Sequence, residues 1–100
     1  MASEQRDANQ LFFRLCSDHL SIEAIPKRHV TINLRAIKEV PLQNFELTMW
    51  TPQFAVFRDT KGHEITVRKD GRMVVRNAGS ESAAKAAATE AWELLLTRNQ

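Results

Sequence analysis

The spacing of hydrophobic residues changes from a helical period near the N-terminus to strict alternation in the middle of the chain. Leu11 and Leu15 recur at helical spacing, and Ser3 is a suitable capping residue upstream of them. This pattern predicts a first helix over residues 4–20, which forms an N-terminal helical extension within residues 1–22.

Alternating polar and apolar residues in the middle of the chain predict an antiparallel sheet. Its strands are expected over residues 29–34, 54–58, 64–68 and 72–76. Gly62 and the Asp70-Gly71 pair mark two hairpin turns, because glycine accepts a positive φ there. Pro41 suits the first turn of a short helix, which is predicted to run to residue 47.

A long helix is predicted in the C-terminal part of the chain. Ser80 or Ser82 caps it, and Glu81 complements the positive end of the helix dipole. The segment 83–91 is rich in alanine, which is the best helix former. The stripe expected to pack on the sheet consists of Ala84, Ala87, Ala88, Ala91 and Leu95. The chain is therefore predicted to form one α+β domain over residues 1–100, an antiparallel sheet covered on one face by this helix.

Strand alternation divides the predicted sheet into two faces with different chemistry. The face beneath the C-terminal helix is expected to hold Val30, Ile32, Ala55, Phe57, Ile65, Val67, Met73 and Val75. The open face is expected to hold His29, Thr31, Phe54, Val56, Arg58, Thr66, Arg68, Arg72, Val74 and Arg76. Arginines neutralise phosphates and an exposed phenylalanine stacks on bases, so we predict a binding surface here. The competing explanation is that the first helix or a second subunit covers Phe54.

Composition narrows the functional classes only modestly. The chain has 100 residues, of which 43% are hydrophobic and 26% are charged, as expected for one globular domain. Its net charge of +2 is too small to indicate a nucleic-acid partner by itself. Cations nevertheless gather between residues 58 and 76. A solvated outer face of the sheet is the alternative explanation of that stretch.

Targeting features predict an intracellular protein, either cytoplasmic or nuclear. The longest apolar runs are too short to cross a bilayer, and residues 1–10 lack the apolar core of a signal peptide. A lone Cys16 cannot form an internal disulfide, and it makes no zinc ligand set with three scattered histidines. We therefore expect no membrane association, no metal and no cofactor.

Few residues are suited to catalysis. Cys16 and His19 lie three positions apart on one side of the predicted first helix, but this spacing arises readily by chance. His63 lies beside a hairpin turn next to Glu64 and has no further partner in the sequence pattern. The sequence has no glycine-rich phosphate loop and no paired-carboxylate motif. We therefore predict a non-enzymatic binding module.

Residues 71–85, Gly-Arg-Met-Val-Val-Arg-Asn-Ala-Gly-Ser-Glu-Ser-Ala-Ala-Lys, resemble the repeat of the TATA-binding protein family, in which a Gly-Lys-Met-Val-Val strand leads into an Ala-Lys-Ser-Glu helix start. Residues 31–34 resemble the Thr-Val-Asn-Leu of that repeat's first strand, and residues 51–55 resemble its Asn-Pro-Lys-Arg-Phe-Ala. The resemblance implies a β-α-β-β-β-α half-saddle over residues 27–98. That family binds the DNA minor groove through its open sheet face and kinks it with inserted phenylalanines. Because the saddle needs two repeats, a homodimer joined edge to edge is predicted.

The resemblance also implies roles for individual residues of the open face. Phe54 matches the first inserted phenylalanine, whereas Arg68 stands where the second is expected. Further groove-facing positions are matched by Thr66, Arg72, Val74 and Arg76. Arginine replaces a small threonine at the last of these. These differences imply DNA binding that relies on phosphate contacts, with weak sequence preference.

Two alternative partners remain open. Residues 84–88, Ala-Lys-Ala-Ala-Ala, also resemble the last helix of the double-stranded RNA-binding domain. That family places a lysine pair where this chain has Glu81 and Ser82, so DNA is expected rather than RNA. An acidic protein is the other candidate partner, because arginines and aromatic residues are also enriched at protein interfaces.

Overall fold

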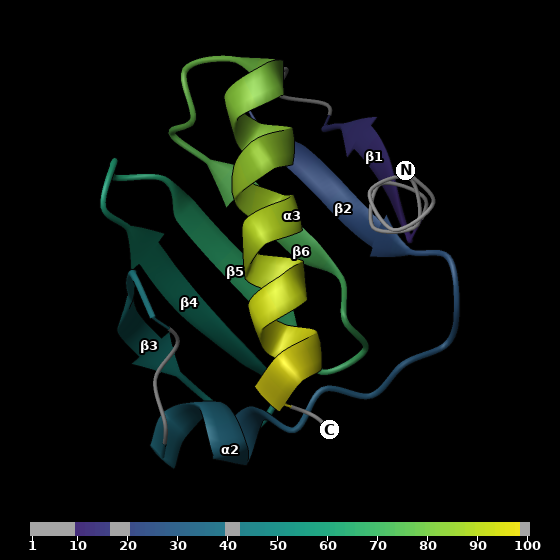
Figure 1. The fold of residues 1–100 in the computed structure, drawn as a ribbon, viewed down its shortest axis with the longest axis vertical. Coiled ribbons are helices and arrows are strands. Elements are labelled where there is room, and N and C mark those ends of the chain that lie inside the picture. The colour runs from purple at the N-terminus through teal and green to yellow at the C-terminus, as the bar shows by residue number, and fades with distance from the viewer. Residues whose placement is uncertain (1–9, 17–20, 40–42, 99–100) are drawn as a thin grey trace.

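The chain folds into a six-stranded antiparallel sheet with one long helix packed across one of its faces (Figure 1). The computed structural model describes residues 10–16, 21–39 and 43–98. Its elements are β1 (Leu11–Leu15), β2 (Ile22–Pro26), α2 (Leu34–Glu39), β3 (Phe45–Trp50), β4 (Phe54–Asp59), β5 (Glu64–Arg68), β6 (Met73–Arg76) and α3 (Glu81–Arg98). The strand order is β1-β2-β6-β5-β4-β3, so β3 to β6 form a meander and the β1–β2 hairpin is added beside β6. The α+β class, the antiparallel sheet and the C-terminal helix are confirmed.

The helix α3 forms where the sequence predicts it and packs through the predicted stripe. Ser80 is its N-cap, since its Oγ accepts a hydrogen bond from the backbone N–H of Ala83 at 3.0 Å. The stripe of Ala84, Ala87, Ala88, Ala91 and Leu95 is buried. Trp92 is buried beside it, and its Nε1–H donates to Gln10 Oε1 at 2.8 Å, which ties α3 to the start of β1.

The core lies between α3 and the inner face of the meander. The predicted inward residues of the three middle strands are all fully buried, with 0% exposure: Ala55, Phe57, Ile65, Val67, Met73 and Val75. A Leu, Ile, Val, Phe or Met side chain buried in this way contributes roughly 1.5–3 kcal/mol. Strict alternation in β4, β5 and β6 thus fixes which residues remain on the opposite, open face.

The predicted N-terminal helix is wrong where the structure describes it, because residues 11–15 form β1. Residues 1–9 and 17–20 lie outside the described residues. Leu11 and Phe13 point to the core while Arg14 faces outward, so this segment also satisfies strand alternation. Pairing with β2 along its whole length, together with an ion pair from Arg14 to Glu23, decides in favour of the strand.

The predicted strand over residues 29–34 is also wrong, since residues 27–33 run along the end of the sheet without forming a strand. Asn33 Oδ1 accepts a hydrogen bond from the backbone N–H of Ala36 at 3.2 Å, which begins α2 at Leu34. The strand that precedes α2 is β2. Residues 31–34 therefore do not form the first strand that the resemblance to the TATA-binding protein repeat implied.

The short helix predicted to follow Pro41 is wrong as well, because residues 45–50 form β3. Residues 40–42 lie outside the described residues. A register shift between Leu47 and Met49 interrupts the alternation of β3, which explains why its sequence does not read as a strand.

Candidate functional site at one end of the open sheet face

The open face carries its side chains in rows that run across the strands. One row, which we call the ion row, consists of Arg76, Glu64, Arg58 and Glu46 in successive strands. The middle row consists of Val74, Thr66, Val56 and Met49. In the third row Arg68 pairs with Phe54, and Arg72 follows in the adjoining hairpin.

The ion row cancels most of its own charge. Arg76 lies 3.9 Å from Glu64, measured from Nη1 to Oε1. Arg58 stands directly opposite Glu64 on one side and Glu46 on the other. Two of the predicted phosphate-binding arginines therefore face carboxylates in the neighbouring strands, and the open face is not uniformly cationic.

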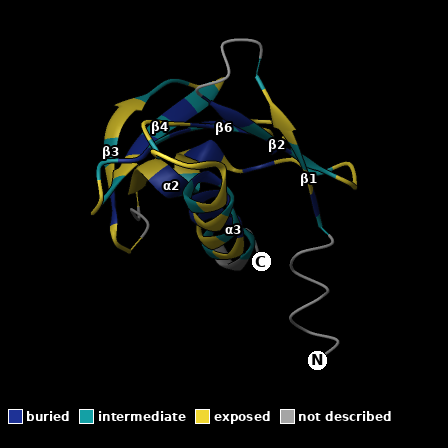
Figure 2. Ribbon diagram, turned by 90° about the horizontal axis from the view of Figure 1, so that it is seen from above, coloured by how far each residue is buried: buried dark blue, intermediate teal, exposed yellow. Residues whose placement is uncertain are grey.

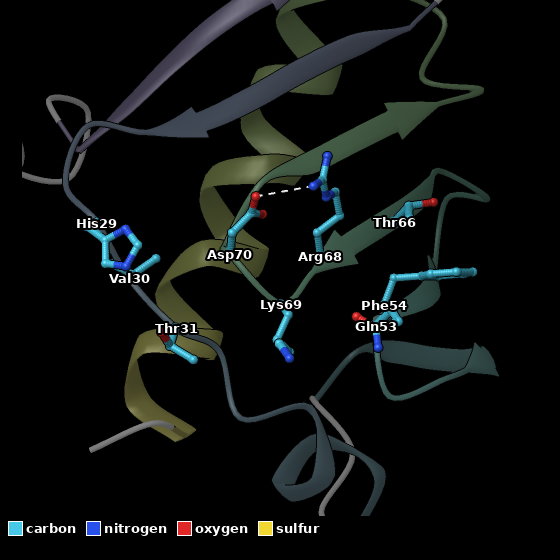
Figure 3. A pocket seen from close by; sticks show the side chains of 9 residues that line it. All are labelled: His29, Val30, Thr31, Gln53, Phe54, Thr66, Arg68, Lys69 and Asp70. Atoms are coloured by element: carbon cyan, nitrogen blue, oxygen red, sulfur yellow. Dashed lines mark ion pairs between the residues drawn. The ribbon is translucent and has the colours of Figure 1, made fainter.

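A hollow of about 500 Å³ lies at the other end of the open face (Figure 3). It is lined by His29, Val30, Thr31, Gln53, Phe54, Thr66, Arg68, Lys69 and Asp70. Five of the residues singled out from the sequence meet in this lining, namely His29, Thr31, Phe54, Thr66 and Arg68. The predicted site residues Arg58, Arg72, Val74 and Arg76 are not part of it. We call this cavity the first hollow.

The backbone around Lys69 joins three segments of the chain at the first hollow. Its N–H donates to the carbonyl of Gln53 at 3.1 Å, and its own carbonyl accepts from the N–H of Ile32 at 2.8 Å. These bonds place His29 and Thr31 beside the hollow, although they belong to no strand. The side chain of Lys69 is exposed, and among the described residues no ion pair holds it.

Phe54 is positioned by the turn that precedes it. Thr51 Oγ1 accepts hydrogen bonds from the backbone N–H groups of Gln53 at 3.1 Å and Phe54 at 3.0 Å. The backbone N–H of Thr51 in turn donates to the carbonyl of Phe54 at 2.8 Å. The ring is half-buried and stands across from Arg68, so part of its surface lines the hollow.

One carboxylate serves two arginines at the hairpin between β5 and β6. Asp70 Oδ2 lies 3.3 Å from Arg68 Nη2 and 3.8 Å from Arg72 Nε. The other oxygen, Oδ1, accepts the backbone N–H of Arg72 at 3.1 Å, which fixes the turn. All three side chains are more than one-third exposed, so these ion pairs are screened by water and weak. The arginines remain able to bind an anion.

Positive charge gathers around this end of the sheet rather than over the open face as a whole. Residues 27–39 are joined to residues 68–72 by the hydrogen bond between Ile32 and Lys69, and the two segments together contain seven cations and two carboxylates. The cations are Lys27, Arg28, Arg35, Lys38, Arg68, Lys69 and Arg72, and the carboxylates are Glu39 and Asp70. This excess is larger than the net charge of +2 of the whole chain. We call this region the basic end.

Comparison with protein-family models, with curated proteins and with solved structures finds no match for this chain. The site must therefore be interpreted from its own geometry. Within the described ranges, no group of three or more His, Cys, Asp or Glu side chains is arranged to hold a metal ion. In the same part of the chain, no helix is long and apolar enough to span a membrane.

Sequence patterns missed several residues of this site. Lys69, Gln53 and Asp70 lie in turns, where strand alternation assigns no face. The turn before β4 and the turn after β5 could have predicted these residues, because both turns lie at the same end of the meander. Cys16 is half-buried, and its predicted neighbour His19 lies outside the described residues.

Proposed function

We propose that this protein is a non-enzymatic module that binds nucleic acid at the basic end. Arg68 and Lys69 contact phosphates, and Phe54 stacks on a base in the first hollow. The observation that carries this proposal is that one cavity joins an accessible aromatic ring with two exposed cations, Arg68 and Lys69, and that among the described residues no ion pair holds Lys69. Each stacked base contributes about 1–3 kcal/mol, and phosphate contacts add a salt-dependent term. Both contributions are nearly independent of the nucleic-acid sequence, so we expect only a weak preference for particular bases.

The resemblance to half of a TATA-binding protein saddle is retained as part of the proposal, without its wedge mechanism. From β2 to α3 the chain runs β-α-β-β-β-β-α, which contains the implied order with one more strand. However, Arg68 occupies the place of a second inserted phenylalanine. Figure 2 shows the sheet arching over α3, so the open face is its outer side. Such a face suits contact at one end better than cradling a bent duplex.

DNA is proposed as the natural partner in preference to double-stranded RNA. The first turn of α3 presents Glu81 and Ser82, both exposed, where the RNA-binding family needs lysines to grip phosphates. Glu81 also lies 3.0 Å from Lys85, so a carboxylate stands where that family needs a cation.

Titration of a fluorescently labelled oligonucleotide, followed by anisotropy at about 50 and about 200 mM salt, tests the proposal. Binding is expected to weaken with salt, and Phe54→Ala and Lys69→Ala are each expected to weaken it roughly tenfold. Lys61→Ala is the matched control for the lysine, because Lys61 is an exposed cation in the turn between β4 and β5. Equal losses from Lys61→Ala and Lys69→Ala, or no salt-dependent binding, would refute it.

A second candidate function is recognition of a protein partner by the middle of the open face. The middle row is largely apolar, and Met49 at its end is 54% exposed. Phe12 in β1 is 58% exposed on the same side of the sheet. An acidic partner that covers these groups and pairs with the nearby arginines fits such a surface. Capture of a protein after nuclease treatment, lost on Met49→Asp, supports this candidate.

A homodimer joined through sheet edges remains part of the proposal. In the described sheet, the edge strands are β1 and β3. The register shift in β3 makes that edge irregular, so β1 is the more suitable edge for pairing. Measurement of the molecular mass in solution by light scattering shows directly whether the chain is a monomer or a dimer.

A further inference from the structure

We propose that the bound nucleic acid is a single strand, and that it continues from the first hollow across Lys69 onto the surface between Trp50 and α2. This inference rests on the proposed function and specifies its ligand and its path. The path follows three adjoining cavities that share lining residues.

The second hollow lies beside the first and has two lining residues in common with it. It has a volume of about 430 Å³ and shares Thr31 and Lys69 with the first hollow. Its remaining lining is Ile32, Asn33, Leu34, Arg35, Trp50 and Pro52. A third cavity of about 620 Å³ shares Arg35, Trp50 and Pro52 with the second and adds Lys38 and Glu39 from α2. Because each cavity shares lining residues with the next, we take the three together as one track along the basic end.

Aromatic rings and cations alternate along this track. Phe54 and Arg68 line its beginning, Lys69 is shared by the first two hollows, and Trp50 and Arg35 both line the second. Lys38 Nζ sits 4.5 Å from the centre of the Trp50 ring. Single-stranded nucleic acid needs this combination, because its phosphates require cations while its unpaired bases require apolar or aromatic surfaces.

The track is held in place before any ligand binds. Trp50 Nε1–H donates to the carbonyl of Leu34 at 2.8 Å, which fixes α2 against β3. Ile32 and Leu34 are 3% and 4% exposed and belong to the core cluster, so they anchor this part of the lining. A surface whose groups are already ordered loses less conformational entropy on binding.

A single strand is favoured over a duplex because of where the apolar groups lie. The faces of paired bases are stacked inside a duplex and cannot reach the rings of Phe54 or Trp50. Duplex phosphates could touch Arg35 and Lys69, but the apolar floors of both hollows would then stay empty. Only unpaired bases fill these floors and allow the cations to reach the backbone at the same time.

The decisive experiment measures binding of labelled single-stranded DNA, single-stranded RNA and duplex DNA of one sequence to the full chain and to two double variants. Arg35→Ala with Lys38→Ala removes two cations of the far part of the track. Arg14→Ala with Lys61→Ala removes two cations from β1 and the β4–β5 turn, away from the track.

The track predicts that the first double variant weakens single-strand binding roughly tenfold and reduces the slope of log affinity against log salt by about 1.4, two contacts at about 0.7 each. The control double variant is expected to retain most of the affinity. Quenching of Trp50 fluorescence on binding provides a second readout, because Trp92 is only 3% exposed. Equal affinities for the DNA and the RNA strand are expected if phosphate contacts and base stacking supply most of the binding free energy.

The outcomes separate this inference from the function on which it rests. If Lys69→Ala weakens binding while Arg35→Ala with Lys38→Ala does not, the ligand ends at the first hollow and the track is refuted. If duplex DNA binds more tightly than the single strand, the assignment of a single strand is refuted. If neither Lys69→Ala nor Arg35→Ala with Lys38→Ala changes the affinity, the proposed function itself is refuted.

Discussion

Replacing Asp70 with asparagine is expected to strengthen nucleic-acid binding, although the change removes two ion pairs. Asp70 stands 3.3 Å from Arg68 and 3.8 Å from Arg72, where it competes with any incoming phosphate. The backbone hydrogen bond of the turn needs only one side-chain oxygen, which asparagine keeps. The hairpin should therefore retain its shape while its charge rises by one unit.

The size of the gain follows from Coulomb's law. A phosphate bound between these arginines would lie about 5 Å from the former carboxylate, so relief of their repulsion in water is worth about 0.8 kcal/mol. That energy corresponds to about a fourfold decrease in Kd. The lost ion pairs are exposed and screened, so the free energy of unfolding should fall by less than about 1 kcal/mol.

The assay is oligonucleotide anisotropy at low salt, with Glu64→Gln as the matched control. Glu64 belongs to the ion row, so its replacement changes the total charge equally but outside the first hollow. Its effect should stay below about 1.5-fold, because Glu64 lies four residues along β5 from Arg68, roughly 13 Å at about 3.3 Å per residue, and charges more than about 10 Å from the phosphate are largely screened. Weaker binding by Asp70→Asn, or an equal gain in both variants, would refute the placement of the phosphate at this hairpin.

Three further predictions concern stability and are checked by chemical denaturation. Asp59→Ala should lower the free energy of unfolding by about 1–3 kcal/mol, since Asp59 Oδ1 accepts two backbone N–H groups of its own turn at 2.9 and 2.8 Å. Gly71→Ala should lower it by about 2–4 kcal/mol, because φ is +90° and the added Cβ would lie only 2.5 Å from Cγ2 of Val30. Gly79→Ala is the control that strains only the backbone, since no atom lies within 4 Å of its added Cβ. Ser80→Ala should lower it by about 1 kcal/mol through loss of the N-cap, and Ser82→Ala should leave it nearly unchanged.

The parts of the fold that the sequence predicts are those decided by local patterns. The meander from β4 to β6 combines strict alternation with a turn at Gly71, whose positive φ and close packing demand glycine. The helix α3 combines a capping serine with an alanine-rich stripe. In both cases the local pattern is enough to predict the element, although the close packing at Gly71 involves Val30, Pro26 and Trp92, which are far away in the sequence.

The parts that failed depend on partners far along the chain. Residues 11–15 satisfy both a helical and an alternating pattern, and pairing with β2 selects the strand. The irregular register of β3 hides its period, and the loop 27–33 is placed by a hydrogen bond to Lys69. For the same reason, alternation placed Arg58 and Arg76 on the open face but could not show that Glu46 and Glu64 stand across from them.

Binding of nucleic acid at the basic end is tested most directly by a backbone NMR titration of the full chain with a short single-stranded oligonucleotide. We expect progressive shifts of the amide signals of Thr31, Phe54, Thr66 and Lys69 as the strand binds in the first hollow. The signal of Glu64, in the ion row, should stay nearly constant. Shifts centred on the ion row, or no shifts at saturating oligonucleotide, would contradict the claim that the basic end binds nucleic acid.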